Sequence, residues 1–259
     1  MILPLAGRRV LVTRAAGQAS RLSEELRRLG AGPVEIPVLE IQPPESYEPL
    51  DAVIRNHFNQ YDWLIFTSAN AVRAVAERAA EQGITLPVPQ LPRVAAIGPA
   101  TAAAAEKFGL KVTLIPEVAY RAEGLLESLG TQTTGKRVLI ARAAIARDVI
   151  PGALRAAGAQ VDVVEAYRNV LPESAPEQLR EAFREKIDAV TFTSSSSVTH
   201  LKQAAEKAGI GFPFAGVLAI SIGSITSQTL REHNWEPATE ANPSDISGLV
   251  AATAKLLHV

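Results

Sequence analysis

The chain has 259 residues, and its 26 Lys and Arg against 27 Asp and Glu give a formal net charge of −1. This near-neutral charge argues against a general nucleic-acid-binding protein, which needs a basic face, and 47% hydrophobic with 20% charged residues excludes a disordered or fibrous chain. The sequence contains no Cys, and its four His are scattered. We therefore expect no disulfide, no thiolate chemistry and no metal site.

Short apolar runs alternate with amphipathic helical runs from the N-terminus onward. In the first half, strands are predicted near 9–13, 33–36, 62–66, 93–97 and 111–115, and helices near 17–29, 47–57, 69–82, 99–108 and 121–129. Arg8 and Arg9 follow the first apolar residues instead of preceding them, so no signal peptide is predicted. The uncharged stretch near 208–230 is broken by Pro213 and several glycines, so no membrane span is expected, and the protein is predicted to be cytoplasmic.

The second half of the chain repeats the first. At an offset of 128 residues, GRRVLVTRAAG from Gly7 matches GKRVLIARAAI from Gly135, and at 126 residues IFTSANAV (65–72) matches TFTSSSSV (191–198). At 125 residues, AIGPAT (96–101) matches SIGSIT (221–226). Strands are predicted again near 137–141, 160–164, 188–192, 217–222 and 235–238. Five strand–helix units per copy predict two similar, doubly wound parallel sheets of α/β type, made by duplication. The Pro-rich stretches 41–49 and 169–177 are linker candidates.

Polar residues collect where these strands end and the next helices begin, which is where parallel α/β sheets bind ligands. They are rich in hydroxyls, backbone N–H groups and arginines and poor in carboxylates, which suits a large polyanion. The same residues are also ordinary helix caps and tight-turn glycines, and that reading stays open. The candidate substrate-binding residues are Arg14, Thr67, Ser68, Asn70, Gly98, Thr101, Arg142, Thr193, Ser194, Ser195, Ser196, Gly223 and Thr226.

Familiar catalytic motifs are missing. There is no G-x-G-x-x-G after a first strand, no phosphate-binding loop and no G-x-S-x-G element, which disfavours a nucleotide-dependent transferase or a serine hydrolase. Acid–base chemistry has few candidates, and Tyr167 is one of them, since it follows a strand at the junction of the two halves and its counterpart at offset 128 is Leu39. A tyrosine that merely packs a hinge is the competing interpretation.

The chain resembles the uroporphyrinogen-III synthase family over essentially its whole length. The resemblance rests on VLVTRA (10–15), IFTSANAV (65–72), IGPAT (97–101), EAYR (165–168), FTSSSSV (192–198), IGSIT (222–226) and PSDISGLV (243–250). It implies two flavodoxin-like lobes, 1–37 with 168–259 and 38–167, which exchange their first strand–helix units. A two-stranded linker near 37–40 and 165–168 would join them.

The resemblance also implies a reaction. Hydroxymethylbilane, a linear tetrapyrrole with eight carboxylates, would lose water and close with ring D inverted to give uroporphyrinogen III, in a monomeric enzyme without a cofactor. Tyr167 matches the family tyrosine that assists loss of the hydroxyl, and Thr101, Thr226 and the serines after Thr193 match family substrate positions. A further expected partner is the enzyme that releases hydroxymethylbilane. The alternative function is a non-enzymatic two-lobed binder of a small polyanion.

Overall fold

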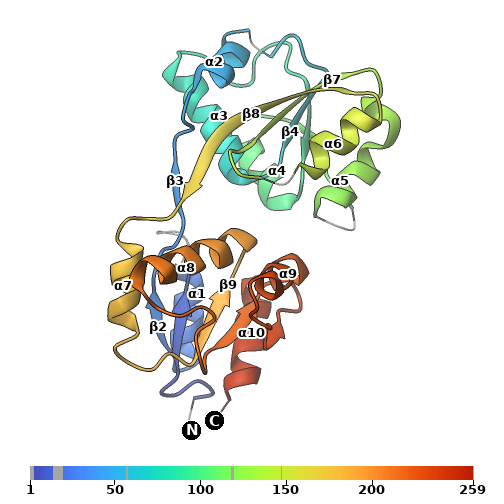
Figure 1. Ribbon diagram of the computed structural model, residues 1–259. Coiled ribbons are helices and arrows are strands. Elements are labelled where there is room, and N and C mark those ends of the chain that lie inside the picture. The colour runs from blue at the N-terminus through green and yellow to red at the C-terminus, as the bar shows by residue number, and fades with distance from the viewer. Residues whose placement is uncertain (1–2, 14–19, 57, 118–119, 147, 259) are drawn as a thin grey trace. The chain divides into compact units, whose positions relative to one another are not determined.

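The computed structural model describes residues 3–13, 20–56, 58–117, 120–146 and 148–258. The chain divides into two compact units, unit 1 (Met1–Ile41 and Asn169–Val259) and unit 2 (Gln42–Arg168). These boundaries lie one to four residues from those expected from the resemblance. The chain leaves unit 1 through β3 (Glu40–Gln42) and returns at the end of β8 (Gln160–Val170), and these two strands are neighbours in one sheet (Figure 1).

Unit 1 is built on a parallel sheet with the strand order β11-β10-β9-β1-β2. Numbered along the chain within the unit, this order is 2-1-3-4-5 read from the β2 side, the flavodoxin-like arrangement. All five strands run the same way, so their carboxyl ends share one edge of the sheet. The strands are β1 (Arg9–Val12), β2 (Gly32–Glu35), β9 (Ala189–Phe192), β10 (Leu218–Ser221) and β11 (Thr239–Glu240).

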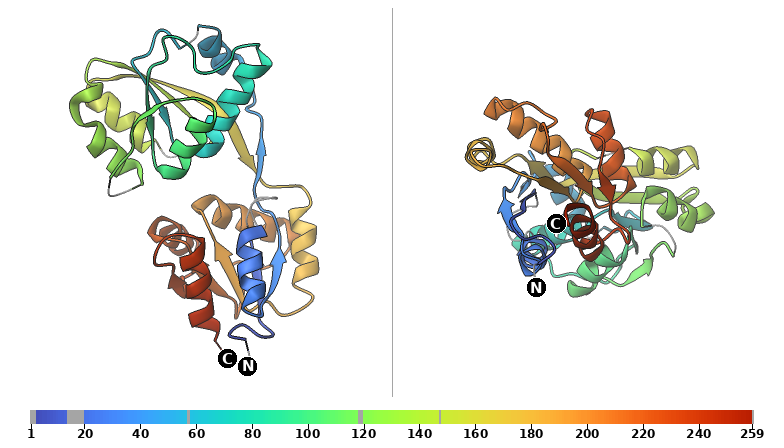
Figure 2. Two further views of the ribbon diagram at one scale, coloured as in Figure 1. Left: turned by 180° about the vertical axis from the view of Figure 1, so that it is seen from behind. Right: turned by 90° about the horizontal axis from the view of Figure 1, so that it is seen from below.

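Alternating side chains of these strands bury against helices on both faces of the sheet. Val10 and Val12 pack with α1 (Ser20–Arg28) and α10 (Ile246–Leu257), which lie side by side in the left view of Figure 2. Leu11 and Phe192 pack into the opposite cluster, which includes residues of α7 (Ala175–Ala182), α8 (Ser195–Ala208) and α9 (Ser224–Glu232). Because both faces of the sheet are covered, β1 has the buried apolar residues Val10, Leu11 and Val12 in succession, as expected for a strand that is buried on both sides.

Unit 2 has a six-stranded sheet with the order β3-β8-β7-β4-β5-β6. Without β3, the order is β8-β7-β4-β5-β6, which is 5-4-1-2-3 when the strands are numbered along the chain within the unit. The spatial arrangement is that of unit 1, with β7 and β8 in the places that β1 and β2 hold there. The strands are β4 (Trp63–Phe66), β5 (Arg93–Ala96), β6 (Val112–Leu114) and β7 (Arg137–Ala143). The helices are α2 (Glu48–Arg55), α3 (Ala69–Glu81), α4 (Pro99–Lys107), α5 (Ala122–Leu129) and α6 (Val149–Ala156), with a 3₁₀ turn at Gly130–Thr133.

The two units share local details as well as topology. Gly30 and Gly158 follow α1 and α6 with φ of 94° and 87°, the left-handed conformation that glycine adopts most easily. Asp62 and Asp188, which precede β4 and β9, each accept a backbone N–H at 2.9 Å, from Arg137 and from Arg9 respectively. The hydrogen bond from Arg137 holds the pKa of Asp62 below its usual value. The expected fold class, two similar doubly wound α/β domains, is confirmed.

One predicted strand is wrong. Residues 235–238 form no strand, and the last strand of the sheet is Thr239–Glu240 instead. Trp235 made this stretch strand-like, but its ring lies in a loop and packs edge-on against Phe192 and Phe212, with centroids 5.6 and 5.0 Å apart. Burial of Trp235 in an aromatic cluster therefore explains why this stretch is hydrophobic without being a strand. The stretches 41–49 and 169–177 also contain the ends of β3 and β8 and the starts of α2 and α7.

Candidate functional site

The strand-end edge of unit 2 carries four of the candidate residues in two successive loops. Ser68 is the N-cap of α3, and its Oγ accepts the backbone N–H of Ala71 at 3.1 Å. Gly98 is the N-cap of α4, and Thr101 lies buried in the first turn of that helix. Thr67 is half-buried directly after β4. Two helix N-termini thus meet the edge where β4 and β5 end, which favours an anionic ligand there.

Tyr167 lies at the same edge because β8 is irregular. Up to Arg142 and Glu165 the two strands β7 and β8 pair residue by residue, but Ala143 pairs with Tyr167, so β8 contains one extra residue. In a regular strand Ala166 and Tyr167 would point to opposite faces. The bulge instead brings both side chains, together with Val164, into the same buried cluster. The irregularity therefore aims the phenol at the α3 side of the sheet.

The hydroxyl groups of Ser68 and Tyr167 meet at this edge. Their oxygens are 3.1 Å apart, and either can be the donor. Tyr167 is 6% exposed and belongs to a buried apolar cluster, so Ser68 supplies a partner for its hydroxyl. The sequence interpretation named both residues but not their contact. The position of Tyr167 depends on the bulge in β8, and the spacing of apolar residues in the sequence does not indicate a bulge.

Two further candidates in unit 2, Arg142 and Asn70, have partners within the protein. Arg142 lies on β7, and its Nη2 is 3.1 Å from the Asp148 carboxylate at the start of α6. Asn70 accepts a hydrogen bond from Arg73 at 2.8 Å. A Cβ on Gly98 would stand 3.1 Å from the Cβ of Tyr120, so the packing of Tyr120 already accounts for the glycine. Their contact with a substrate stays a prediction.

The corresponding edge of unit 1 carries the serine run. Ser194 is the N-cap of α8 and forms a reciprocal capping box with Ser197, which is fully buried. Ser195 accepts a hydrogen bond from Thr229 of α9 at 2.8 Å, while Thr193 and Ser196 are half-buried. The structure thus gives Ser194 and Ser197 a capping role. It leaves the side chain of Ser196 without a hydrogen bond to the described residues.

Two of the remaining unit 1 candidates, Gly223 and Thr226, lie at the start of α9. Gly223 is the N-cap of α9, and a Cβ there would lie 3.2 Å from the Oγ of Ser244. Thr226 is buried in the first turn of α9, as Thr101 is in α4. Arg14 lies outside the described residues.

Comparison with known proteins identifies the family. The family model described as "Uroporphyrinogen-III synthase HemD" matches residues 20–251. The chain belongs to the uroporphyrinogen-III synthase family. A curated uroporphyrinogen-III synthase from Synechococcus elongatus is 38% identical over 255 residues, covering 96% of this chain and 95% of the relative. One from Escherichia coli is 30% identical over 199 residues, covering 74% and 78%.

Solved structures agree on the fold. A mutant uroporphyrinogen III synthase from Thermus thermophilus superposes with a TM-score of 0.69 at 20% identity, covering 97% of this chain and 99% of that chain. The enzyme from Helicobacter pylori gives 0.63 at 19% identity, covering 96% and 99%. The resemblance and the function inferred from the sequence are confirmed: the protein is an enzyme, a cyclising lyase of tetrapyrrole biosynthesis that acts on hydroxymethylbilane.

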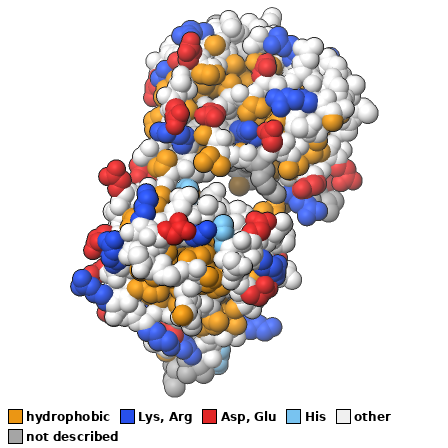
Figure 3. Space-filling view, viewed as in Figure 1, with side chains coloured by type: hydrophobic (Ala, Val, Ile, Leu, Met, Phe, Trp, Pro, Cys, Tyr) orange, Lys and Arg blue, Asp and Glu red, His pale blue; other side chains and the backbone are white. Residues whose placement is uncertain are grey.

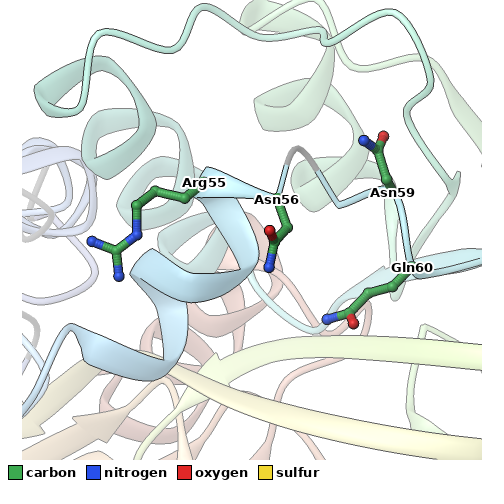
Figure 4. A pocket seen from close by; sticks show the side chains of 4 residues that line it. All are labelled: Arg55, Asn56, Asn59 and Gln60. Carbon is green, nitrogen blue, oxygen red and sulfur yellow. The ribbon is translucent and has the colours of Figure 1, made fainter.

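Unit 2 of this uroporphyrinogen-III synthase family member also has a polar hollow of about 500 Å³ (Figure 4). It lies where the chain enters β4, at the opposite end of that strand from Thr67. Next to it, burial raises the pKa of Tyr61 to about 12, and the Asp162 carboxylate, which accepts its hydroxyl at 2.9 Å, adds to the shift. The hollow is therefore separate from the strand-end candidates. Its lining residues are Arg55, Asn56, Asn59 and Gln60.

The surface carries both signs of charge. On the face drawn in Figure 3, Lys and Arg side chains are interspersed with Asp and Glu over both units. Within the described ranges, no three His, Asp or Glu side chains gather in a way that could hold a metal ion. No helix in the described part of the chain is both long and apolar enough to span a bilayer.

Proposed function

We propose that Tyr167 donates its phenol proton, or a hydrogen bond, to the hydroxyl that leaves hydroxymethylbilane. The observation that carries this role is its 3.1 Å contact with Ser68 at a strand-end edge. Ser68 Oγ already accepts the N–H of Ala71, so its own hydrogen is available for the phenol oxygen. When Ser68 donates in this contact, the hydrogen of Tyr167 is left to point at a ligand.

The rest of the catalysis is orientation. Loss of the hydroxyl leaves an electrophilic azafulvene, and the protein has to direct ring D to react at its substituted carbon through a spiro intermediate. Holding reactants in a productive geometry is worth several kcal/mol, up to about 7–11. We propose that the helix N-termini and hydroxyls at the strand-end edges of both units bind the eight carboxylates of this substrate. The proposed contacts are Arg14, Thr67, Ser68, Asn70, Gly98, Thr101, Arg142, Thr193, Ser194, Ser195, Ser196, Gly223 and Thr226.

The decisive experiment supplies freshly made hydroxymethylbilane and separates the uroporphyrinogen I and III isomers. The wild-type protein should give mostly the III isomer, and Tyr167→Phe should form it much more slowly. A Phe variant with wild-type turnover and isomer ratio would contradict the role of Tyr167 and favour a purely packing tyrosine. The monomeric state, the cytoplasmic location and a contact with the enzyme that supplies hydroxymethylbilane stay predictions.

A further inference from the structure

At the strand-end edge of unit 1, two hydrogen-bonded serine hydroxyls lead to a carboxylate. The Oγ atoms of Ser221 and Ser227 are 2.6 Å apart, and Ser227 Oγ donates to the Oε2 of Glu240 at 2.6 Å. Ser221 is the last residue of β10, Ser227 lies in the second turn of α9, and Glu240 is the last residue of β11. Ser221 and Glu240 are also register partners in the parallel pair of strands. Three elements therefore converge on this chain of contacts.

The fold itself does not require the network, and unit 2 is the internal control. At the same offset of 125 residues, Ser221 and Ser227 correspond to Ala96 and Ala102, and Glu240 corresponds to Ile115. Ala96 and Ala102 are 0% and 3% exposed, so the same junction of strand and helix closes well with methyl groups. Buried polar networks rarely stabilise a fold more than well-packed apolar side chains of similar size. The polar version in unit 1 therefore points to a task other than folding.

Glu240 is unusual in its surroundings. Glu240 is exposed, and among the described residues no Lys, Arg or His lies within ion-pair distance of its carboxylate. Among the described residues, the hydrogen bond from Ser227 is the one made to this carboxylate, and it uses only one of the two oxygens. The second acidic side chain of this edge, Asp245, caps α10 through the N–H of Gly248 at 2.7 Å. Glu240 thus presents an oriented acceptor oxygen at an edge that otherwise offers mainly donors.

The substrate supplies the matching donors. Besides its carboxylates, a tetrapyrrole carries pyrrole N–H groups, which lose their water when they are bound and then need acceptors. A carboxylate is an acceptor only and forms stronger bonds than a neutral group. We propose that Glu240, oriented by Ser227 and Ser221, binds the N–H of a pyrrole ring of the substrate. This inference rests on the proposed function and adds a recognition element that neither unit's helix termini can supply.

The direction in which one substitution changes the affinity for the product tests the proposal. In Glu240→Gln the amide oxygen can still accept from Ser227, so the network is kept, while a donor NH₂ replaces the free acceptor oxygen. We expect this variant to bind uroporphyrinogen III, the reduced product, about 10- to 100-fold more weakly in anaerobic calorimetry. If Glu240 has no pyrrole contact, removing a negative charge from a site for an octa-anion should leave affinity unchanged or raise it. Either of those outcomes overturns the proposal.

Two further variants complete the experiment. Glu232→Gln makes the same charge change in the last turn of α9, where Glu232 accepts a hydrogen bond from Gln228, and it should bind product as the wild type does. Ser227→Ala keeps the Glu240 carboxylate but removes the hydrogen bond that orients it. This variant should weaken product binding less than Glu240→Gln does. Wild-type turnover of hydroxymethylbilane is measured in parallel. Wild-type turnover in Tyr167→Phe refutes the proposed role of Tyr167, whereas a Glu240→Gln variant that binds the product as tightly as the wild type, or more tightly, refutes only the role of Glu240.

Discussion

Ser68 and Tyr167 are 99 residues apart in the chain, yet their hydroxyl oxygens are 3.1 Å apart in unit 2. Each side chain arrives there for a different reason. Ser68 caps α3 immediately after β4, whereas Tyr167 is turned toward it by the extra residue in β8. The unit 1 counterpart of Ser68 is Ser194, which caps α8 in the same way, but the counterpart of Tyr167 is Leu39. Both halves of the chain therefore have the capping serine, whereas the tyrosine of unit 2 corresponds to a leucine in unit 1.

Replacing Tyr167 by Phe should lower kcat by about 10²–10⁴-fold, the range typical of general-acid assistance. The ring remains to fill the buried cluster, so the fold should be kept. Turnover of hydroxymethylbilane, with the isomers resolved, measures the effect. Thr101→Ala is the comparison, because one neutral hydrogen bond contributes only about 0.5–1.5 kcal/mol and the loss should mainly weaken binding. Equal losses in the two variants would argue against a special role for Tyr167.

Ser68→Ala and Ser194→Ala form a matched pair of cap deletions. Each removes the side chain that accepts a backbone N–H at a helix start, so each should lower the free energy of unfolding by about 0.5–2 kcal/mol in urea denaturation. Only Ser68→Ala also removes the partner of the Tyr167 phenol. We expect Ser68→Ala to reduce kcat further when Tyr167 is present than in the Tyr167→Phe background. Additive effects in this double-mutant cycle would show that the contact has no catalytic consequence.

The sequence predicted the α/β class, the duplication and most strands, because continuous apolar runs between helical patterns leave little choice of fold. It also placed Ser68, Gly98 and Ser194 at helix starts, where the structure has them as N-caps. It could not predict the Ser68–Tyr167 contact, since this contact depends on a bulge in β8 and the alternation of apolar and polar residues does not reveal a bulge. It missed Glu240 because the strand was expected near Trp235, a few residues too early. Comparing Ser227 with Ala102 across the repeat was the signal that could have drawn attention to that network.

Two glycines in helices should respond in opposite ways to Ala. A Cβ on Gly248 in α10 would lie 2.0 Å from the carbonyl oxygen of Pro243, whereas nothing lies within 4 Å of a Cβ on Gly152 in α6. Gly248→Ala should therefore lower the free energy of unfolding by about 1–3 kcal/mol or more through overpacking. Gly152→Ala should raise it by about 0.4–1 kcal/mol, because the unfolded chain loses conformational freedom. Calorimetric unfolding of both variants beside the wild type checks the signs.

His200 should make unit 1 sensitive to mild acid. Burial lowers the pKa of this side chain below its ordinary 6.5, although the hydrogen bond to the Val38 carbonyl acts against the shift. The distance from Nδ1 to that carbonyl oxygen is 2.9 Å, and because a carbonyl can only accept, Nδ1 carries the proton of the neutral ring. Below about pH 6.5 the unfolded chain binds a proton that the folded chain resists, so the free energy of unfolding falls as the pH decreases toward the folded pKa.

The slope of this loss is at most about 1.4 kcal/mol per pH unit for one group. His200→Asn keeps a donor near the position of Nδ1 but cannot titrate. The variant should be less stable than the wild type at pH 7, and its stability should change less between pH 6.5 and pH 5. The Asp62 and Asp188 carboxylates do not interfere, because their pKa values are lowered from 3.8 and they titrate in more acidic solution. Urea unfolding at a series of pH values separates the two cases: the same slope in the variant as in the wild type would show that protonation of His200 does not limit the acid stability of unit 1.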